Sequence, residues 1–406
     1  MRITTAQRLT LLAICSFLTF GFNLNNCGGG GGTKQDPLDK VCQENECLSI
    51  AEFSKRMQDA LNGNTVGYAL TVSYGGLLRD SAAAGLGRTA SDPPQKEFKT
   101  SDRMNVASVN KTVTAVAVLK SLAANNLTVD EKIKTHLPGD WKPGANVGDL
   151  TFKDLLTHAT GFREANGSMP NGNNTGYNDL KQFVERDLKP ADRQKDFDCS
   201  QSADKSQCYK NQDFALFRLI IPYLNGFKEA GVTDKGTALG AAYLDYLDKN
   251  IFAPMSIKNV GCAPDKKSPT LFYPFPAGTI NGTDFGDWTA GCGAGGIHLS
   301  ADDLATFLAQ LRHTNALLDE TQRKQMNDDL LGWQNVQSVK HGTCRWHGGY
   351  LFVPTAGGVA QDNDFIMDCD NGMQVTLLSN SPMPGGQPLK IVSVVFAAYD
   401  ASWHPK

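Results

Sequence analysis

The segment SVNKTVTAVAVLKSL, from Ser108 to Leu122, is the stretch on which the fold assignment depends. Ser108 and Lys111 lie three residues apart, so on a helix their side chains share one face. A serine hydroxyl is a weak nucleophile until a neighbouring base takes its proton, and a desolvated lysine can be that base. The apolar residues after Lys111 predict a buried helix, whose N-terminal N–H groups favour developing negative charge. Taken alone, the pattern also fits a capping serine followed by a surface lysine.

Two more motifs could carry chemistry further along the chain. Tyr209-Lys210-Asn211 places a phenol and an amide two residues apart, on one side of the segment if it is extended. His347-Gly348-Gly349 precedes an apolar run, where glycines allow a ligand backbone to approach a strand closely. Each motif is weak by itself. Ser202-Ala203-Asp204-Lys205 repeats the serine–lysine spacing within a polar loop, and an isolated HGG is more often a structural bend.

Local patterns predict strands at both ends of the chain. The runs 67–74 and 77–84 flank Gly75-Gly76, which is a hairpin signal. Near the C-terminus, 346–353, 365–369 and 373–379 are short apolar runs, and Asp370-Asn371-Gly372 joins the last two as a turn. The segment from 163 to 207 is polar and is predicted to be a solvated loop.

In this order, the three motifs resemble those of the serine β-lactamase and D-Ala-D-Ala peptidase superfamily. The most similar branch contains class C β-lactamases, DD-peptidases and related esterases. The resemblance runs from about Gly67 to the final helix and includes TFKDLLTHATGF at 151–162 and further segments at 250–255 and 293–297. It implies an α+β fold, an antiparallel sheet flanked by helices with an inserted, mainly helical subdomain at about 108–286. His158, within the first of these segments, is expected to be a core or turn histidine.

The resemblance also implies a role for each motif. Ser108 would attack a carbonyl and become acylated, while Lys111 and Tyr209 would move protons; which of the two is the general base stays open. The backbone N–H groups of Ser108 and Tyr350 would form the oxyanion hole. The residues expected to bind the substrate are Asn211, His347, Gly348, Gly349 and Tyr350.

One departure from the superfamily bears on the substrate. Many β-lactamases and penicillin-binding proteins have Lys-Thr-Gly where this chain has His347-Gly348-Gly349. A histidine is only partly charged near neutral pH, and Gly348 has no hydroxyl to hold a carboxylate. We therefore expect a serine hydrolase that acts on an ester or amide carbonyl, of the esterase or D-amino-acid peptidase type rather than an efficient β-lactamase. The alternative is a non-catalytic surface lipoprotein that keeps the fold and binds a cell-wall or peptide ligand.

The N-terminus predicts export. Arg2 and Arg8 accompany an apolar stretch at 9–24, which is shorter than the roughly 20 residues of a spanning helix and fits a signal peptide over 1–26. Leu24 precedes Cys27 by three residues, as in a lipoprotein cleavage box, and glycines 28–32 would tether a lipidated Cys27 to the body. This gives an anchored segment at 27–47 and a hydrolase domain at 48–402. In the alternative, an ordinary signal is cleaved and Cys27 is incidental.

The chain has ten cysteines, and export gives most of them a meaning. Without Cys15 and Cys27, eight remain, an even number that is typical of disulfides in an exported protein. Cys344 and Cys369 would pair across neighbouring antiparallel strands, and Cys199 with Cys208 would tie the loop that delivers Tyr209. Elimination leaves Cys42 with Cys47 and Cys262 with Cys292.

Composition sets limits on the partners. Lys and Arg number 39 against 42 Asp and Glu, which lacks the basic excess that nucleic-acid binding requires. No Cys/His cluster has zinc-site spacing, and no cofactor is expected. The expected partners are a small-molecule or peptide acyl substrate and a membrane, contacted through the lipid anchor; no oligomeric state is predicted. A eukaryotic glycoprotein is disfavoured, because the sequon at Asn110 lies inside the proposed site.

Overall fold

The computed structural model describes residues 39–202 and 205–406. The predicted signal peptide, the glycine tether and Cys27, the predicted lipidation site, lie outside the described residues. Within the described ranges, no helix is both long enough and apolar enough to cross a membrane.

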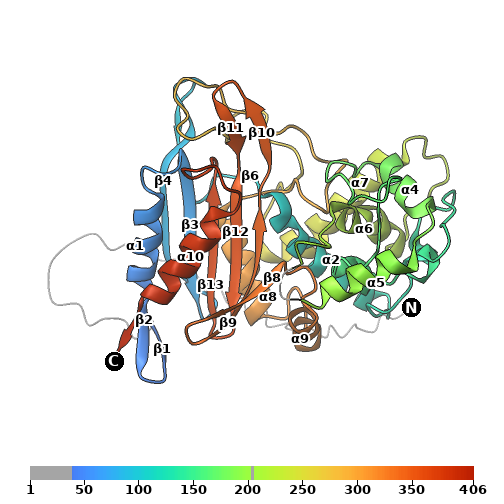
Figure 1. The fold of residues 1–406 in the computed structure, drawn as a ribbon, viewed down its shortest axis with the longest axis horizontal. Helices are drawn as coiled ribbons and strands as arrows, with labels where there is room; N and C mark the ends of the chain where they lie inside the picture. Colours follow the sequence, from blue (N-terminus) through green and yellow to red (C-terminus); the bar gives the residue numbers. More distant parts are fainter. Residues whose placement is uncertain (1–38, 203–204) are drawn as a thin grey trace, which may run out of the picture. The chain divides into compact units, whose positions relative to one another are not determined.

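A seven-stranded sheet forms the centre of the fold (Figure 1). Its strand order is β5-β4-β3-β13-β12-β9-β8, and every neighbouring pair is antiparallel. The strands are β3 (Gly67–Tyr74), β4 (Leu77–Arg88), β5 (Lys96–Glu97), β8 (Asn335–Val339), β9 (Gly342–Gly349), β12 (Asn363–Cys369) and β13 (Met373–Ser379). The predicted turn at Gly75-Gly76 has positive φ at both residues, 62° and 79°, where glycine is favoured. Both ends of the chain thus contribute to one sheet, which confirms the α+β prediction.

Helices cover both faces of this sheet (Figure 1). On one face, α1 (Ile50–Leu61) and α10 (Lys390–Ala401) pack on the side chains of Leu70, Val72 and their neighbours. On the other face, α8 (Ala301–His313) packs against β3 and β13, and Ala69 belongs to the core of that side. The alternation between Ala69 and Leu70 follows from the two-residue period of a strand.

The helical region joins the two halves of the sheet. Its central helices are α2 (Asn110–Ala124) and α6 (Asn211–Leu224), which pack on each other. The apolar residues of α2 lie all round the helix, as in a helix that is buried on every side. The other elements are η1 (Ala107–Val109), η2 (Ile133–His136), η3 (Val147–Asp149), α3 (Phe152–Leu156), α4 (Tyr177–Glu185), α5 (Pro190–Ser200), α7 (Lys235–Leu247), η4 (Asp248–Phe252) and η5 (Ala253–Met255).

Two sequence-based expectations were wrong in detail. The segment 163–207, predicted to be a solvated loop, contains α4 and α5, because Leu180, Phe183 and Val184 give α4 a buried face. The predicted strand 346–353 is interrupted after Gly349. The Leu351 N–H donates to the Asp362 carboxylate instead of to a ladder partner, and β10 (Phe352–Thr355) then begins a separate hairpin with β11 (Gly358–Gln361).

Three smaller elements complete the fold. The first is a sheet of β1 (Lys40–Gln43), β2 (Glu46–Ser49) and β14 (Trp403–Pro405). The second is the pair β6 (Met104–Asn105) and β7 (His298–Leu299), which leads into η1. The third is helix α9 (Glu320–Asp328).

The structure joins the cysteines in the predicted pairs. Cys344 and Cys369 are register partners on β9 and β12, as expected for neighbouring antiparallel strands. Cys199 bonds to Cys208, next to Tyr209. The pairs left by elimination are also formed, Cys42 with Cys47 and Cys262 with Cys292. Four disulfides fit a protein of an extracellular or periplasmic compartment.

Candidate active site

Ser108 lies in the short turn η1, directly before the buried helix α2. The Asn105 side chain accepts a hydrogen bond from the Ala107 N–H at 2.9 Å and holds this turn. The end of β9 lies against this turn. A β-carbon added to Gly349 would stand 2.8 Å from the Val106 carbonyl oxygen and 3.1 Å from the Ser108 nitrogen, so the backbone leaves no room for a side chain there. The backbone that approaches Gly349 is therefore the chain's own, where the sequence suggested a ligand.

The Lys111 amine is fully buried beside Ser108. Its Nζ lies 3.0 Å from Ser108 Oγ, and it donates hydrogen bonds to Asn211 Oδ1 at 2.7 Å and to the Ala294 carbonyl at 2.6 Å. Burial lowers the pKa of Lys111 well below its usual value, although the charge of Asp213 raises it in part. A neutral amine has two N–H groups, which these two acceptors satisfy, so its lone pair is left for the serine hydroxyl.

Tyr209 lies next to the same amine. The centre of its ring is 4.7 Å from Lys111 Nζ, and its hydroxyl is buried with no hydrogen-bond partner of normal geometry among the described residues. Burial raises the pKa of the Tyr209 phenol, and the neighbouring Ser108 hydroxyl lowers it in part. The phenol therefore keeps its proton at neutral pH.

Asn211 reaches the site by a different geometry from the one predicted. It is the first residue of α6, so Tyr209 and Asn211 do not share an extended segment. Asn211 accepts from Lys111 and donates from Nδ2 to the Gly172 carbonyl at 3.0 Å. Its amide thus positions the lysine and ties the loop at Gly172 to α6.

His347 is buried on β9 and faces Tyr209, with 6.2 Å between the ring centres. Burial, with a smaller contribution from the nearby Lys111, lowers the pKa of His347 to about 3. The sequence alone indicated a partly charged group, whereas in the folded protein the imidazole is neutral near pH 7. Its Nδ1 lies 2.7 Å from the Gly348 carbonyl oxygen.

Ser108, Tyr209 and Asn211 border a cavity of about 570 Å³. Lys111 and His347 are buried behind its lining. One wall consists of the loop around Gly172, and the other of Gly348 and the residues after β9. Lys210 is the one charged residue in the lining, as far as the described residues show. Its ammonium group is buried and lies 2.6 Å from the Asp196 carboxylate. The lining is Ser108, Pro170, Asn171, Gly172, Asn173, Ser206, Tyr209, Lys210, Asn211, Gln334, Gly348, Tyr350, Leu351, Phe352 and Leu389.

Sequence reasoning missed a buried ionic network behind the site. Asp196 accepts hydrogen bonds from Lys210 at 2.6 Å and from two nitrogens of Arg163 at 2.7 and 2.9 Å. Asp213 accepts from the Thr160 hydroxyl at 2.7 Å and lies 3.1 Å from His158 Nδ1. Burial raises the pKa of Asp213 to about 7. A buried charge next to Tyr209 was detectable in the sequence only as the lysine of Tyr209-Lys210-Asn211.

His158 joins this network to Tyr209. It is buried, has a positive φ of 67°, and its ring centre lies 4.5 Å from that of Tyr209. The expectation of a core or turn histidine is confirmed, since it is both.

The second serine–lysine motif does not form a comparable site. Lys205 Nζ donates to the Leu330 carbonyl at 3.0 Å, and the exposed Ser202 hydroxyl donates to the Cys199 carbonyl at 2.8 Å. This agrees with the expectation that a serine–lysine pair within a polar loop is only a weak motif.

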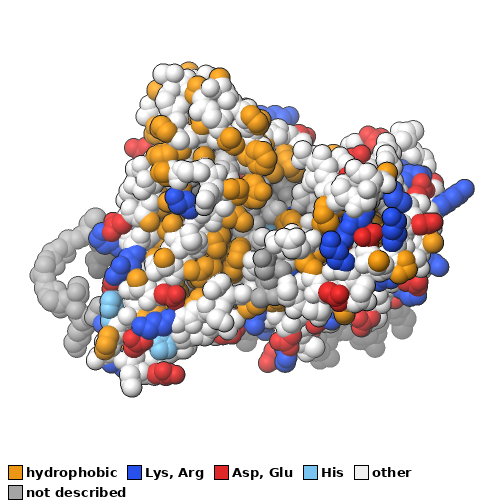
Figure 2. All heavy atoms as spheres, viewed as in Figure 1, with side chains coloured by type: hydrophobic (Ala, Val, Ile, Leu, Met, Phe, Trp, Pro, Cys, Tyr) orange, Lys and Arg blue, Asp and Glu red, His pale blue; other side chains and the backbone are white. Residues whose placement is uncertain are grey.

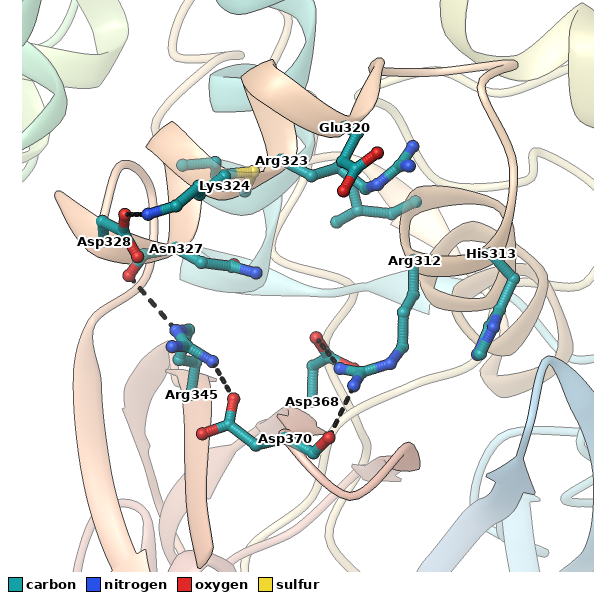
Figure 3. A pocket seen from close by; sticks show the side chains of 12 residues that line it. Arg312, His313, Glu320, Arg323, Lys324, Asn327, Asp328, Arg345, Asp368 and Asp370 are labelled. Carbon is teal, nitrogen blue, oxygen red and sulfur yellow. Dashed lines mark hydrogen bonds and ion pairs between the residues drawn. The ribbon is translucent and has the colours of Figure 1, made fainter.

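A second cavity, of about 420 Å³, lies between α8, α9 and the ends of β9 and β12 (Figure 3). It is rich in charge, but its arginines are engaged. Arg312 bonds to both oxygens of Asp368 at 3.0 Å and to the Asp370 carbonyl, and Arg345 bonds to the Asp370 carboxylate at 2.6 Å. These contacts join the sheet to α8. The Ser108–Lys111 pair makes the first cavity the candidate active site.

Comparisons with known proteins agree with this fold. A family model described as Beta-lactamase matches residues 50–391. The structure is similar to that of D-amino acid amidase from Ochrobactrum anthropi SV3 complexed with D-phenylalanine, with a TM-score of 0.61 at 16% identity over 87% of this chain and 99% of that chain.

Two other solved structures extend the likeness. A β-lactamase/D-alanine carboxypeptidase from Yersinia pestis, complexed with citrate, has a TM-score of 0.61 at 14% identity over 87% of this chain and 99% of that one. An octameric penicillin-binding protein homologue from Pyrococcus abyssi has a TM-score of 0.59 at 14% identity over 86% of this chain and 76% of that one. Among curated proteins, none matches the sequence. At these identities, the structural likeness establishes the fold.

Proposed function

Since the chain belongs to the Beta-lactamase family and is of its serine hydrolase type, we propose that it is an exported enzyme that cleaves an ester or amide carbonyl through an acyl-enzyme on Ser108. The observation that carries this proposal is the amine of Lys111. It lies 3.0 Å from Ser108 Oγ, and acceptors occupy both N–H groups of its neutral form.

The opposite pKa shifts of Lys111 and Tyr209 support the following proton transfers. Lys111, with its pKa lowered by burial, takes the proton of Ser108 as Oγ attacks the carbonyl carbon. The backbone N–H groups of Ser108 and Tyr350 stabilise the oxyanion, and one such donor typically contributes about 2.7–4 kcal/mol. Tyr209, with its pKa raised, gives its proton to the leaving group as the bond to the carbonyl carbon breaks, and regains a proton from Lys111. Water then hydrolyses the acyl-enzyme by the same transfers in reverse order.

The neutral His347 supports an ester or amide substrate over a β-lactam. Near pH 7, a histidine whose pKa is about 3 offers no positive charge to a substrate carboxylate. We therefore place the activity with esterases and D-amino-acid peptidases, and expect poor turnover of penicillins and cephalosporins.

Covalent labelling tests the proposed nucleophile. A fluorophosphonate probe should label the wild-type protein on the peptide that contains Ser108, and Ser108→Ala should abolish labelling. The matched control is Ser202→Ala, from the second serine–lysine motif, which should label like the wild type. A folded protein that refuses the probe and is inert to esters would contradict the proposal and favour the non-catalytic binder.

A substrate panel tests the type of hydrolase. It compares p-nitrophenyl acetate, a D-Ala-D-Ala peptide and a chromogenic cephalosporin at equal concentration. Turnover of the ester or the peptide without the cephalosporin supports the assignment, whereas fast cephalosporin hydrolysis would overturn it.

We also propose that a lipid on Cys27 anchors the enzyme to a membrane. The support is the leucine three residues before Cys27 and the glycines after it. Wild-type protein expressed from the full sequence should incorporate a palmitate analogue and enter the detergent phase of Triton X-114, while Cys27→Ala should do neither. Detergent partitioning that survives Cys27→Ala would contradict the anchor.

A further inference from the structure

We propose that Tyr350 and Phe352 determine the specificity of this site, as an aromatic shelf that receives an uncharged apolar or aryl acyl group. The proposal rests on the acylation of Ser108 proposed above. It narrows the substrate to uncharged esters or amides whose acyl part is larger than acetyl.

The two rings form one continuous surface at the edge of the cavity. They stand two residues apart and stack with 6.1 Å between ring centres and an interplanar angle of 14°. Tyr350 is 38% exposed and Phe352 56%, although large apolar side chains of this protein are mostly buried. Figure 2 shows hydrophobic side chains gathered around the β10–β11 hairpin, which carries Phe352, whereas the helical region has many charged side chains. Exposed aromatic surface that lines a cavity is typical of a binding site.

The shelf is fixed relative to the reacting carbonyl. Tyr350 directly follows Gly349, whose backbone lies against the nitrogen of Ser108. Leu351, between the two aromatic residues, donates its N–H to the Asp362 carboxylate, and the Asp362 N–H donates to the Leu351 carbonyl at 3.1 Å. A preorganised surface binds with a smaller loss of conformational entropy.

The hairpin beneath the shelf is also anchored. Phe352 pairs with Gln361 across β10 and β11, and the Gln361 N–H donates to the Tyr273 carbonyl at 3.4 Å. The Tyr273 hydroxyl in turn donates to Asp92 at 2.9 Å and accepts from the Thr89 N–H at 3.0 Å. The exposed rings therefore project from a structure that holds its own backbone in place.

We place the acyl part of the substrate, and not its leaving group, on the shelf. The leaving group takes its proton from Tyr209, whose ring faces His347 with 6.2 Å between the ring centres. Tyr350 and Phe352 border the same cavity as Ser108. The acyl group is expected to fill the part of the cavity at these two rings.

The facing wall does not supply a charge for the acyl group. The loop residues Asn171, Gly172 and Asn173 carry no ionisable side chain, and Gln212 holds this loop through the Asn171 carbonyl at 2.7 Å. An ionised acyl group would be desolvated between this loop and the aromatic shelf without a counter-ion, which is unfavourable. The cavity therefore favours an acyl group that is apolar.

The test compares acyl groups on one leaving group. Wild-type protein should have a kcat/KM for p-nitrophenyl phenylacetate that exceeds that for p-nitrophenyl acetate by roughly tenfold or more. Phe352→Ala should remove most of this preference, measured as the ratio of the two kcat/KM values in the same variant. Leu78→Ala is the matched control, because Leu78 is also exposed but lies on the β3–β4 hairpin; it should behave like the wild type. Thermal unfolding checks that each variant is folded.

A second pair of esters tests the charge requirement. p-Nitrophenyl hexanoate and mono-p-nitrophenyl adipate have acyl chains of the same length, and only the adipate ends in a carboxylate. We expect the hexanoate to be favoured by roughly tenfold or more. Acetate turnover with no preference for phenylacetate, or a preference that survives Phe352→Ala, overturns the shelf while leaving the acyl-enzyme intact. Loss of turnover on every ester, together with no labelling of Ser108, contradicts the proposed function itself.

Discussion

Two buried groups of acids lie on either side of the candidate site, and they differ in how their charge is balanced. In the helical region, Asp196 is surrounded by the ammonium group of Lys210 and the guanidinium group of Arg163. In the sheet, Asp362 and Asp364 are fully buried, and both oxygens of Asp364 lack a hydrogen-bond partner among the described residues. Burial raises the pKa of both sheet acids well above the usual value, and the charge of Asp362 raises that of Asp364 further.

This difference indicates what each group does. The helical network is ionic and saturated with hydrogen bonds, so it fixes the segment that carries Tyr209 and Asn211. Burial disfavours the charged form of both sheet acids, and Asp362 is the member with a defined contact, from the N–H of Leu351. Asp364 pairs with Gly349 across β12 and β9, beside the turn of Ser108. Its burial has a cost in stability that no hydrogen bond among the described residues offsets.

The largest expected effect comes from breaking the helical network. Asp196→Ala removes the carboxylate that bonds the buried Lys210 at 2.6 Å and Arg163 at 2.7 and 2.9 Å. It leaves Lys210 with Asp213 at 3.8 Å and Arg163 with Asp192 at 3.6 Å. Since these longer contacts do not replace the lost hydrogen bonds, the free energy of unfolding should fall by about 3–5 kcal/mol. Urea unfolding measures this loss. The control is Asp192→Ala, because Asp192 lies 3.6 Å from Arg163 and is 28% exposed; its loss should stay below about 1 kcal/mol. Equal losses in the two variants would show that the network is not what stabilises this region.

The next effect has the opposite sign and comes from the sheet pair. The folded-state pKa of Asp364 is raised, so its contribution to stability is complete below the unfolded pKa near 4 and is lost as pH rises through the folded pKa. Asp364→Asn removes this loss. Relative to the wild type, we expect the variant to gain unfolding free energy steadily as pH rises above 4, by about 1.4 kcal/mol for each pH unit over which the folded Asp364 keeps its proton. Urea unfolding at pH 4, 6 and 8 measures the change, and parallel pH profiles would refute the assignment.

The smallest effect concerns an acid on the same strand that does have a cation. Asp368 accepts two hydrogen bonds from Arg312 at 3.0 Å (Figure 3). Arg312 is 24% exposed, so in a variant without the Asp368 charge, water solvates part of its guanidinium group. Asp368→Asn should therefore cost about 1 kcal/mol of unfolding free energy. A gain like that expected for Asp364→Asn would show that the partner is irrelevant.

Much of this organisation follows from local patterns in the sequence. Gly75-Gly76 and Asp370-Asn371-Gly372 are turn sequences, and each joins two strands of the observed sheet. Cys344 precedes the strand of His347, and Cys369 ends the next predicted strand. Because these ends lie close together in an antiparallel pair, the Cys344–Cys369 bond also could be predicted. The serine–lysine motif gave the correct contact, since three residues on a helix bring two side chains together whatever the rest of the chain does.

Contacts between distant segments could not be predicted in this way. His158 and Asp213 are 55 residues apart, and no periodic pattern in the sequence indicates that their side chains are in contact. The neutral state of His347 depends on burial by the whole fold, so its residue type alone indicated a partly charged group. The interruption after Gly349 depends on the Asp362 carboxylate, which competes with the strand ladder for the N–H of Leu351.

The central strands β3 and β13 have a consequence for the order in which the chain folds. The hydroxyls of Thr71 and Thr376 bond across them at 2.8 Å, although the two residues are 305 positions apart. β3 is synthesised about 300 residues before β13, so one edge of the β3–β4 hairpin lacks its partner while the helical region is made. An open edge with buried-type residues such as Leu70 and Val72 is prone to pairing with other chains. The cavity beside Ser108 likewise stays incomplete until the end of β9 and Tyr350, which border it, have been made.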